Sequence, residues 1–396
     1  MVKSNPNFFE LKREYIFPVI EKKLFEHTAK YPLAEVINVG IGDISLPLAP
    51  IVASAISAAV EEMSLTTSMK GYGPSEGYSF LREDIAKHEF EIVNISPEEI
   101  FISDGINSEI AYVLELFDPS ARVAIADPSY PVYKDSSLIA GKSITLMPCL
   151  EENDCLPLPP KNAVDLIYLC TPSNPTGTAM NKKALARFVA YAQEHSAIIL
   201  YDNAYAAFIH SEDVPKTIYE IPGAEQVAIE FRSFSKSAGF TGLRCGYTIV
   251  PKTITVDSLE GKMALIQLWR KKVSIKSNGV SYPVQRGAQS CFTLEGKAQI
   301  DAQIKAYKSS ATALRNGLEN LGYMCYGGKD SPFIWWKIPT GYTSWEFFDI
   351  LLEKCHIIAI PGSGFGKYGE GFIRLSAFTS LSKVHIALDR IQTLKL

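Results

Sequence analysis

Residues 231–251, FRSFSKSAGFTGLRCGYTIVP, collect hydroxyl groups, one ammonium and one guanidinium among small side chains. Ser233 and Ser235 are followed by Lys236, and Arg244 comes eight residues later. Hydroxyl and guanidinium groups bind phosphate oxygens, and a lysine removed from water becomes a base or a nucleophile. The stretch therefore predicts a phosphate site, an activated lysine, or both. A polar turn without function is the simplest alternative.

Four further stretches place polar groups directly after short apolar runs. IFISDGINSE (100–109) leads through Gly105 into a helical pattern, which makes the backbone amides of Ile106 and Asn107 available to an anion. The other stretches are ADPSYPVY, LCTPSNPTGT and LYDNAYAAF. They supply Tyr130, Asn174 (before a proline, where a cis peptide bond can occur), Asp202 and Tyr205.

The elements that must position these residues form a regular alternation between about residues 75 and 250. Seven short runs are rich in β-branched residues and almost continuously apolar, as strands buried on both faces of a mainly parallel sheet are. Helical patterns separate several of them, which predicts an α/β doubly wound domain. Ligands of such sheets bind beyond the carboxyl ends of the strands. Each polar residue alone could be an ordinary turn, capping or solvated residue. Five strand ends with such residues are better explained by one shared site than by five unrelated turns.

The length of the chain and a change in its sequence pattern after about residue 285 predict two domains. The chain has 396 residues, of which 47% are hydrophobic, and this length exceeds the size at which one core keeps growing. We predict an N-terminal arm and part of a small domain over 1–50, a large domain over 51–284, and a smaller α+β domain over 285–396. The last of these begins with a long polar helix and closes on the strand GFIRLSAF.

Several classes of function are disfavoured. A net charge of −4 gives no reason to expect a nucleic-acid or acidic-membrane partner. The sequence contains no run of eighteen apolar residues, so we expect no membrane span. The seven cysteines form no CxxC pair, which predicts reduced thiols and a cytoplasmic protein. The six histidines are dispersed, so no metal site is expected. GFGKYG (364–369) precedes a strand rather than a helix, which favours a glycine-rich turn over a dinucleotide site.

The motifs SNPTG (173–177), YDNAY (201–205) and SFSKSAGFTGLRCGY (233–247) resemble those of the class I/II pyridoxal-phosphate (PLP) aminotransferases of fold type I. The resemblance covers essentially the whole chain. It implies a large domain with a mainly parallel seven-stranded sheet, a smaller α+β domain and a PLP cofactor. It also implies catalytic roles for Lys236, Asp202 and Tyr205.

By that resemblance, Lys236 forms the Schiff base and moves the proton between the substrate and the cofactor, while Asp202 keeps the pyridine nitrogen protonated. Tyr205 and Asn174 hydrogen-bond the phenolic oxygen of the ring, and Tyr130 stacks on the ring. The phosphate is bound by Ser233, Ser235, Arg244, the amides near Ile106 and Asn107, and Tyr72 of a neighbouring subunit. A homodimer with shared active sites follows.

Further motifs indicate the substrate. NVGIGDISLPLAP (38–50), GYGPSEGYSFLRE (71–83) and SNGVSYPVQRGAQ (277–289) resemble the LL-diaminopimelate aminotransferase family. That likeness implies the interconversion of LL-2,6-diaminopimelate and 2-oxoglutarate with tetrahydrodipicolinate and glutamate, for lysine and peptidoglycan. The substrate contacts that it implies are Tyr15, Gly42, Tyr130, Asn174, Asn278 and Arg374, the last of which clamps the α-carboxylate.

Two departures fall where the distal end of the substrate would bind. Asn107, in DGIN, replaces a lysine that relatives often have, and the acidic residue Glu76, in GYGPSEG, is displaced by one position. These changes predict relaxed selectivity between LL and meso isomers. Three alternatives stay open: another class I/II aminotransferase (aspartate, aromatic or alanine type), a C–S lyase, and a non-enzymatic binding protein or regulator on the same fold.

Overall fold

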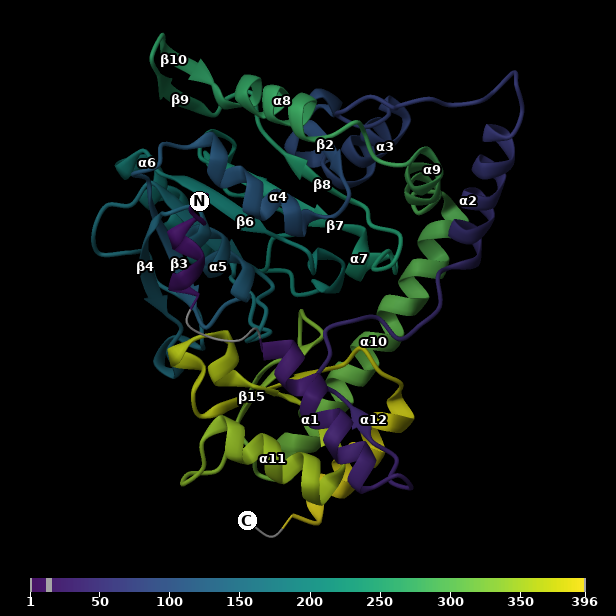
Figure 1. Cartoon of the computed structure of the whole chain (residues 1–396), viewed down its shortest axis with the longest axis vertical. Helices are drawn as coiled ribbons and strands as arrows, with labels where there is room; N and C mark the ends of the chain where they lie inside the picture. The colour runs from purple at the N-terminus through teal and green to yellow at the C-terminus, as the bar shows by residue number, and fades with distance from the viewer. Residues whose placement is uncertain (1, 12–15, 395–396) are drawn as a thin grey trace.

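The computed structural model describes residues 2–11 and 16–394, and its large domain is built on a seven-stranded sheet (Figure 1). The strand order is β2-β8-β7-β6-β5-β3-β4, and β8 alone runs antiparallel to its neighbours. All seven predicted strands are confirmed. They are β2 (Ile100–Ser103), β3 (Arg122–Asp127), β4 (Ser143–Pro148), β5 (Leu166–Cys170), β6 (Ile198–Asp202), β7 (Ala228–Ser233) and β8 (Gly246–Ile249).

The apolar strands are buried on both faces because helices cover the sheet from both sides. Successive residues of β5 alternate between two separate hydrophobic clusters, with Ile167 and Leu169 in one and Leu166 and Tyr168 in the other. The helices of this domain are α3 (Ser79–Glu89), α4 (Ile106–Tyr112), α5 (Pro131–Ile139), α6 (Lys182–His195), α7 (Phe234–Ser237) and α8 (Leu265–Lys276). A hairpin of β9 (Thr255–Ser258) and β10 (Gly261–Ala264) precedes α8.

The small domain contains an antiparallel sheet of order β11-β12-β15-β14. Its strands are β11 (Cys325–Gly327), β12 (Phe333–Lys337), β14 (Ile360–Pro361) and β15 (Phe372–Ser376), and its helices are α11 (Ser344–Cys355) and α12 (Leu381–Gln392). Residues from the N-terminus join it. The strand β1 (Ile37–Asn38) pairs in parallel with β13 (Ile357–Ile358), and ion pairs join α1 (Ile16–Lys30) to α11 (Figure 1).

Three helices link the two domains. The helix α2 (Pro50–Met63) packs on α9 (Tyr282–Ser290), and α10 (Leu294–Asn320) runs from the large domain down into the small one (Figure 1). The GFGKYG segment forms two short 3-10 turns before β15, so the predicted glycine-rich turn is confirmed. Over the described ranges, no helix combines the length and apolarity needed to cross a bilayer. The same residues contain no group of three or more histidine, cysteine, aspartate or glutamate side chains arranged to hold a metal ion.

Candidate active site

The carboxyl ends of six strands meet at one edge of the large sheet, because β2 and β3–β7 share one direction. That edge receives the five predicted sets of polar residues. Ser233 ends β7, Asp202 ends β6, and Asn174 follows β5 in a cis peptide bond with Pro175. Tyr130 follows β3 as the residue before α5, and Ile106 with Asn107 opens α4 after β2. The structure thus brings together residues that span more than a hundred positions of the sequence.

Lys236 lies on α7, a single helical turn directly after β7. The turn begins where the Ser233 hydroxyl accepts a hydrogen bond from the Ser235 amide at 3.1 Å. The Lys236 Nζ donates to the carbonyl of Gly42 at 2.5 Å and lies 3.8 Å from Asp43 Oδ1. Burial lowers the pKa of Lys236 to about 8 despite the opposing charge of Asp43. The neutral amine that a nucleophile or base requires is therefore more populated near neutral pH than in an exposed lysine.

Asp202 is a buried carboxylate with one strong donor. The Tyr133 hydroxyl donates to Asp202 Oδ2 at 2.5 Å, and the Ala204 amide donates to Oδ1 at 3.1 Å. Burial raises the pKa of Asp202 to about 6, although these two hydrogen bonds work in the opposite direction. Tyr133 is itself buried and stacks on Tyr168, with ring centroids 5.0 Å apart. A carboxylate held this way suits a cationic partner, which would compensate its burial.

A cradle of donors forms where β2 and β7 end. Arg244 adopts a left-handed backbone conformation (φ 65°) and its guanidinium packs against Gly105. A Cβ at Gly105 would lie 2.2 Å from Arg244 Nη2, so any other residue here would displace the arginine. Arg244 Nη1 also reaches Ser235 Oγ at 3.4 Å. Guanidinium, hydroxyl and the first amides of α4 are the donor set that a phosphate dianion takes.

Arg374 brings the small domain into the site. This fully buried residue of β15 donates from Nη1 to Asn174 Oδ1 and from Nη2 to the Gly40 carbonyl, both at 2.7 Å. Its guanidinium lies over the Phe333 ring, 4.6 Å from the centroid, and the Tyr205 ring meets Phe333 edge-on at 5.1 Å. A carboxylate that entered here would find a planar donor fork already oriented.

Gly42 and Asn107 occupy the rim. A Cβ added at Gly42 would come within 3.6 Å of Arg374 Nη2, which places this glycine beside the arginine. The exposed Asn107 accepts a hydrogen bond from the Tyr130 hydroxyl at 3.0 Å. Asn107 is therefore tied to the tyrosine that is predicted to stack on the cofactor.

Other predicted residues lie apart from this set. Tyr72 is 89% exposed and Asn278 is also exposed. Their loops lie against each other, since a Cβ at Gly279 would approach the Pro74 carbonyl oxygen to 2.9 Å. Tyr15 lies outside the described residues.

Glu76, the displaced acidic residue, forms two ion pairs. They join it to Arg270 at 3.1 Å and to Arg82 at 3.3 Å. Its carboxylate is thus engaged between α3 and α8, and these contacts give it a role in the large domain.

The sequence did not single out Tyr133 or Asp43. Tyr133 stands three residues after Tyr130 on the first turn of α5, and this spacing puts both on one helix face. Asp43 directly follows Gly42. Either could have been found from its neighbour, but the contacts with Asp202 and Lys236 appear only in the fold.

This fold is that of the PLP-dependent transferases of fold type I, with the site at the expected edge of the sheet. The model of the family described as aminotransferase class I and II matches residues 34–391. The chain belongs to that family and is an aminotransferase.

Curated relatives and a solved structure show which aminotransferases the chain resembles. LL-diaminopimelate aminotransferases of Desulforapulum autotrophicum and Prochlorococcus marinus are each 44% identical over 405 residues, which cover 99% of this chain and 99% of theirs. The solved L,L-diaminopimelate aminotransferase of Chlamydomonas reinhardtii superposes with a TM-score of 0.93 at 40% identity, over 98% of both chains. The resemblance to this group that the sequence motifs indicated is confirmed.

Proposed function

We propose that this aminotransferase uses pyridoxal 5′-phosphate to interconvert LL-2,6-diaminopimelate and 2-oxoglutarate with tetrahydrodipicolinate and glutamate. The product would serve as a precursor of lysine and peptidoglycan. The observation that carries the proposal is the site itself, which combines a lysine of lowered pKa, a buried aspartate and a buried arginine fork. The full-length likeness to LL-diaminopimelate aminotransferases supports the choice of substrate.

The residues present fit this cofactor. The Gly105 cradle with Ser235 and Arg244 suits the phosphate, and the buried Asp202 suits a protonated ring nitrogen. Tyr205 and Asn174 would hold the phenolic oxygen, and Tyr130 would cover the ring. When bound, PLP supplies a sink for the electron pair that remains at the substrate Cα after its proton is removed.

The protein's own groups then have distinct tasks. Arg374 would bind the α-carboxylate and orient the substrate, and Lys236 would remove the Cα proton. Asn174 is already hydrogen-bonded to Arg374, so the groups that hold cofactor and substrate are mechanically linked. Phe333 and Phe365 flank the arginine and would exclude water from the ion pair that it forms with a substrate carboxylate.

We further infer a homodimer that completes each site. Tyr72 and Asn278 project from neighbouring exposed loops, where a second subunit would cover them. In that arrangement Tyr72 would reach the phosphate of the partner and Asn278 its substrate. A cytoplasmic location is supported by the seven cysteines, all of which are free thiols.

A donor profile tests the proposed function. Purified protein loaded with PLP is incubated with 2-oxoglutarate and, in turn, LL-diaminopimelate, aspartate, tyrosine, alanine or cystathionine. We expect glutamate and cyclised product with diaminopimelate at a kcat/KM at least about a hundredfold above the others. Preference for another donor would replace the substrate assignment, and release of a thiol from cystathionine would identify a C–S lyase.

The variant Tyr133→Phe tests whether the Tyr133 hydroxyl lowers the pKa of Asp202. Loss of the hydroxyl removes a hydrogen bond that favours the ionised carboxylate, so the pKa of Asp202 should rise above its present value of about 6. The ionised form favours cofactor binding, although the phosphate contacts supply most of the affinity, so the acid limb of PLP association should move modestly to higher pH. Titration of the apoprotein with PLP across pH measures the shift. An unchanged acid limb would show that Tyr133 does not tune Asp202.

Asn107→Lys tests distal recognition. Asn107 offers no charge to the distal carboxylate of diaminopimelate, and an uncharged contact discriminates less than an ion pair. We expect the natural protein to use meso-diaminopimelate measurably, and the lysine variant to prefer the LL isomer more strongly. The ratio of kcat/KM for the two isomers in both proteins is the measurement. Complete rejection of the meso isomer by the natural protein, or a ratio that does not move, would remove Asn107 as a selectivity determinant.

A further inference from the structure

The segment that carries Tyr205 is a long connection between two strands of the sheet. It runs over residues 203–218, from the end of β6 to the start of a 3-10 helix (Ile218–Glu220), and is called the Tyr205 loop below. It has little regular structure of its own apart from the single turn Ala206–Phe208. Its conformation must therefore be fixed by contacts with other segments.

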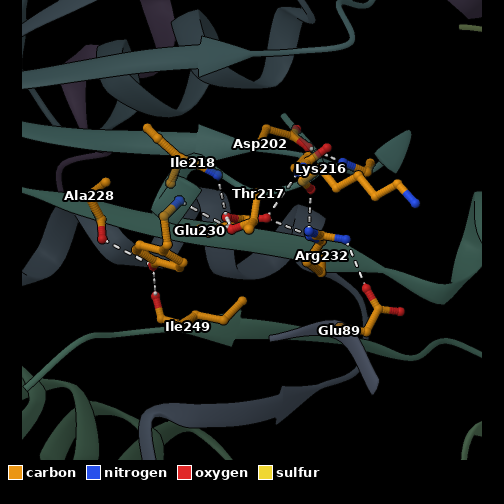
Figure 2. A network of polar contacts seen from close by, with 12 residues as sticks. Glu89, Asp202, Lys216, Thr217, Ile218, Ala228, Glu230, Arg232 and Ile249 are labelled. Atoms are coloured by element: carbon orange, nitrogen blue, oxygen red, sulfur yellow. Dashed lines mark hydrogen bonds and ion pairs between the residues drawn. The ribbon is translucent and has the colours of Figure 1, made fainter. Parts of the chain in front are cut away.

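Glu230 of β7 closes the base of the loop. Its fully buried carboxylate accepts hydrogen bonds from both ends of the segment: Asn203 Nδ2 at 3.0 Å, the Thr217 hydroxyl at 2.5 Å and the Ile218 amide at 3.1 Å. Figure 2 shows the Thr217 hydroxyl and the Ile218 amide converging on this carboxylate. The first and last residues of the loop thus share one acceptor.

Arg232 makes the buried charge of Glu230 tenable. Its Nε donates to Glu230 at 2.5 Å, its Nη1 to Glu89 at 3.0 Å and its Nη2 to the Lys216 carbonyl at 2.5 Å (Figure 2). A buried charge with all its hydrogen bonds satisfied specifies one geometry, whereas a partly satisfied one is costly. Arg232 directly precedes Ser233, and Asn203 directly follows Asp202. The network therefore lies one residue from two predicted cofactor contacts.

Asp330 holds the middle of the same loop. This buried residue lies between β11 and β12 of the small domain, and its Oδ1 accepts from the His210 and Ser211 amides at 2.8 and 2.9 Å. Its Oδ2 accepts from the Ser211 hydroxyl at 2.7 Å. Three residues further on, Phe333 contacts Tyr205. The small domain, which also carries Arg374, thus contacts the loop through Asp330 and Phe333.

We propose that Glu230 and Asp330 are positioning residues, which hold the Tyr205 loop so that Tyr205 is presented to the cofactor. This proposal rests on the proposed use of PLP. Both carboxylates bond backbone and side-chain donors of the loop other than Tyr205, so both act through the loop. Loss of either anchor should loosen the loop and weaken cofactor binding, because the cofactor would then have to order the loop on binding.

Two mild variants on the loop test the proposal. Thr217→Val removes the hydroxyl donor to Glu230, and Ser211→Ala removes the hydroxyl donor to Asp330. Each has a matched control among buried residues away from the loop. Thr248→Val removes a hydroxyl of β8 that has no hydrogen-bond partner among the described residues, and Ser290→Ala removes a buried hydroxyl of α9 that is bonded to the Gly287 carbonyl at 2.7 Å.

The readouts are the Kd of PLP for the apoprotein and the hydrogen exchange of the loop amides. We expect each loop variant to weaken PLP binding about threefold to tenfold and to speed exchange within 203–218, because one buried hydrogen bond is lost. Neither control should change either quantity. The double loop variant should bind PLP more weakly than each single variant.

The outcomes distinguish a failure of the proposed function from a failure of the positioning role. If the natural protein binds no PLP, the proposed function fails. If it binds PLP and the loop variants bind it as tightly as the controls do, with only a shared loss of melting temperature, the anchors are merely structural and the positioning role is overturned.

Discussion

Lys236→Ala should reduce multiple-turnover transamination by more than about a thousandfold, since proton transfer loses both its base and its positioning. The variant should still bind PLP, because Ser235, Arg244 and the Gly105 cradle are untouched. Borohydride reduction followed by intact-mass measurement separates the two effects. The natural protein should gain the mass of the cofactor and the variant should not.

The expected loss follows from the surroundings of Lys236. Burial brings its pKa to about 8, and Nζ is held toward the Gly42 carbonyl on the substrate side of the site. Among the described residues near it, Asp43 carries the opposite charge and cannot supply an amine. Turnover of the alanine variant close to that of the natural protein would remove Lys236 from the mechanism.

Asp202→Asn should lower kcat by several orders of magnitude, where each 1.36 kcal/mol of lost transition-state stabilisation is about tenfold. The substitution keeps the shape of the side chain but removes the anion that would stabilise a protonated ring nitrogen. Cofactor affinity should fall only modestly, because the phosphate contacts are unchanged. A decrease in kcat below about tenfold would mean that another group protonates the ring.

The same variant should make the apoprotein more stable above pH 6. The pKa of Asp202 is raised to about 6 in the folded chain from 3.8, so its contribution favours folding at low pH and is lost as pH rises through this window. The buried charge then costs on the order of 3 kcal/mol, which asparagine avoids. Urea unfolding of both apoproteins at about pH 4 and about pH 8 measures this difference. If the difference in unfolding free energy between the two apoproteins is the same at both pH values, the burial of Asp202 does not destabilise its charged form.

The large sheet could be predicted because its strands are fully buried. Continuous apolar runs such as LIYLC and IILYD leave one interpretation, and the polar residues after them mark the functional edge. The short strands β13 and β14 have two residues each, too few for any periodic signal. The strand β13 forms because Ile37, distant in the sequence, pairs with Ile357, and β14 forms because Ile360 pairs with Arg374 of β15.

The site was predictable where its residues form local motifs, as Lys236 and Arg244 do. Contacts between distant segments were not, such as the bond from Tyr133 to Asp202 or the anchoring of His210 by Asp330, 120 residues away. One signal was available: Glu230 and Arg232 stand two residues apart among the apolar residues of one predicted strand, and buried charges in such a place must be paired.

A half-reaction tests the central claim most directly. The PLP-loaded protein is mixed with excess LL-diaminopimelate in the absence of any oxo acid, and the cyclised product is quantified. The account predicts about one equivalent of product per subunit, and about one equivalent of glutamate when 2-oxoglutarate is added afterwards. No product in the first step, or continued turnover without an oxo acid, would contradict the assignment of this chain as an LL-diaminopimelate aminotransferase.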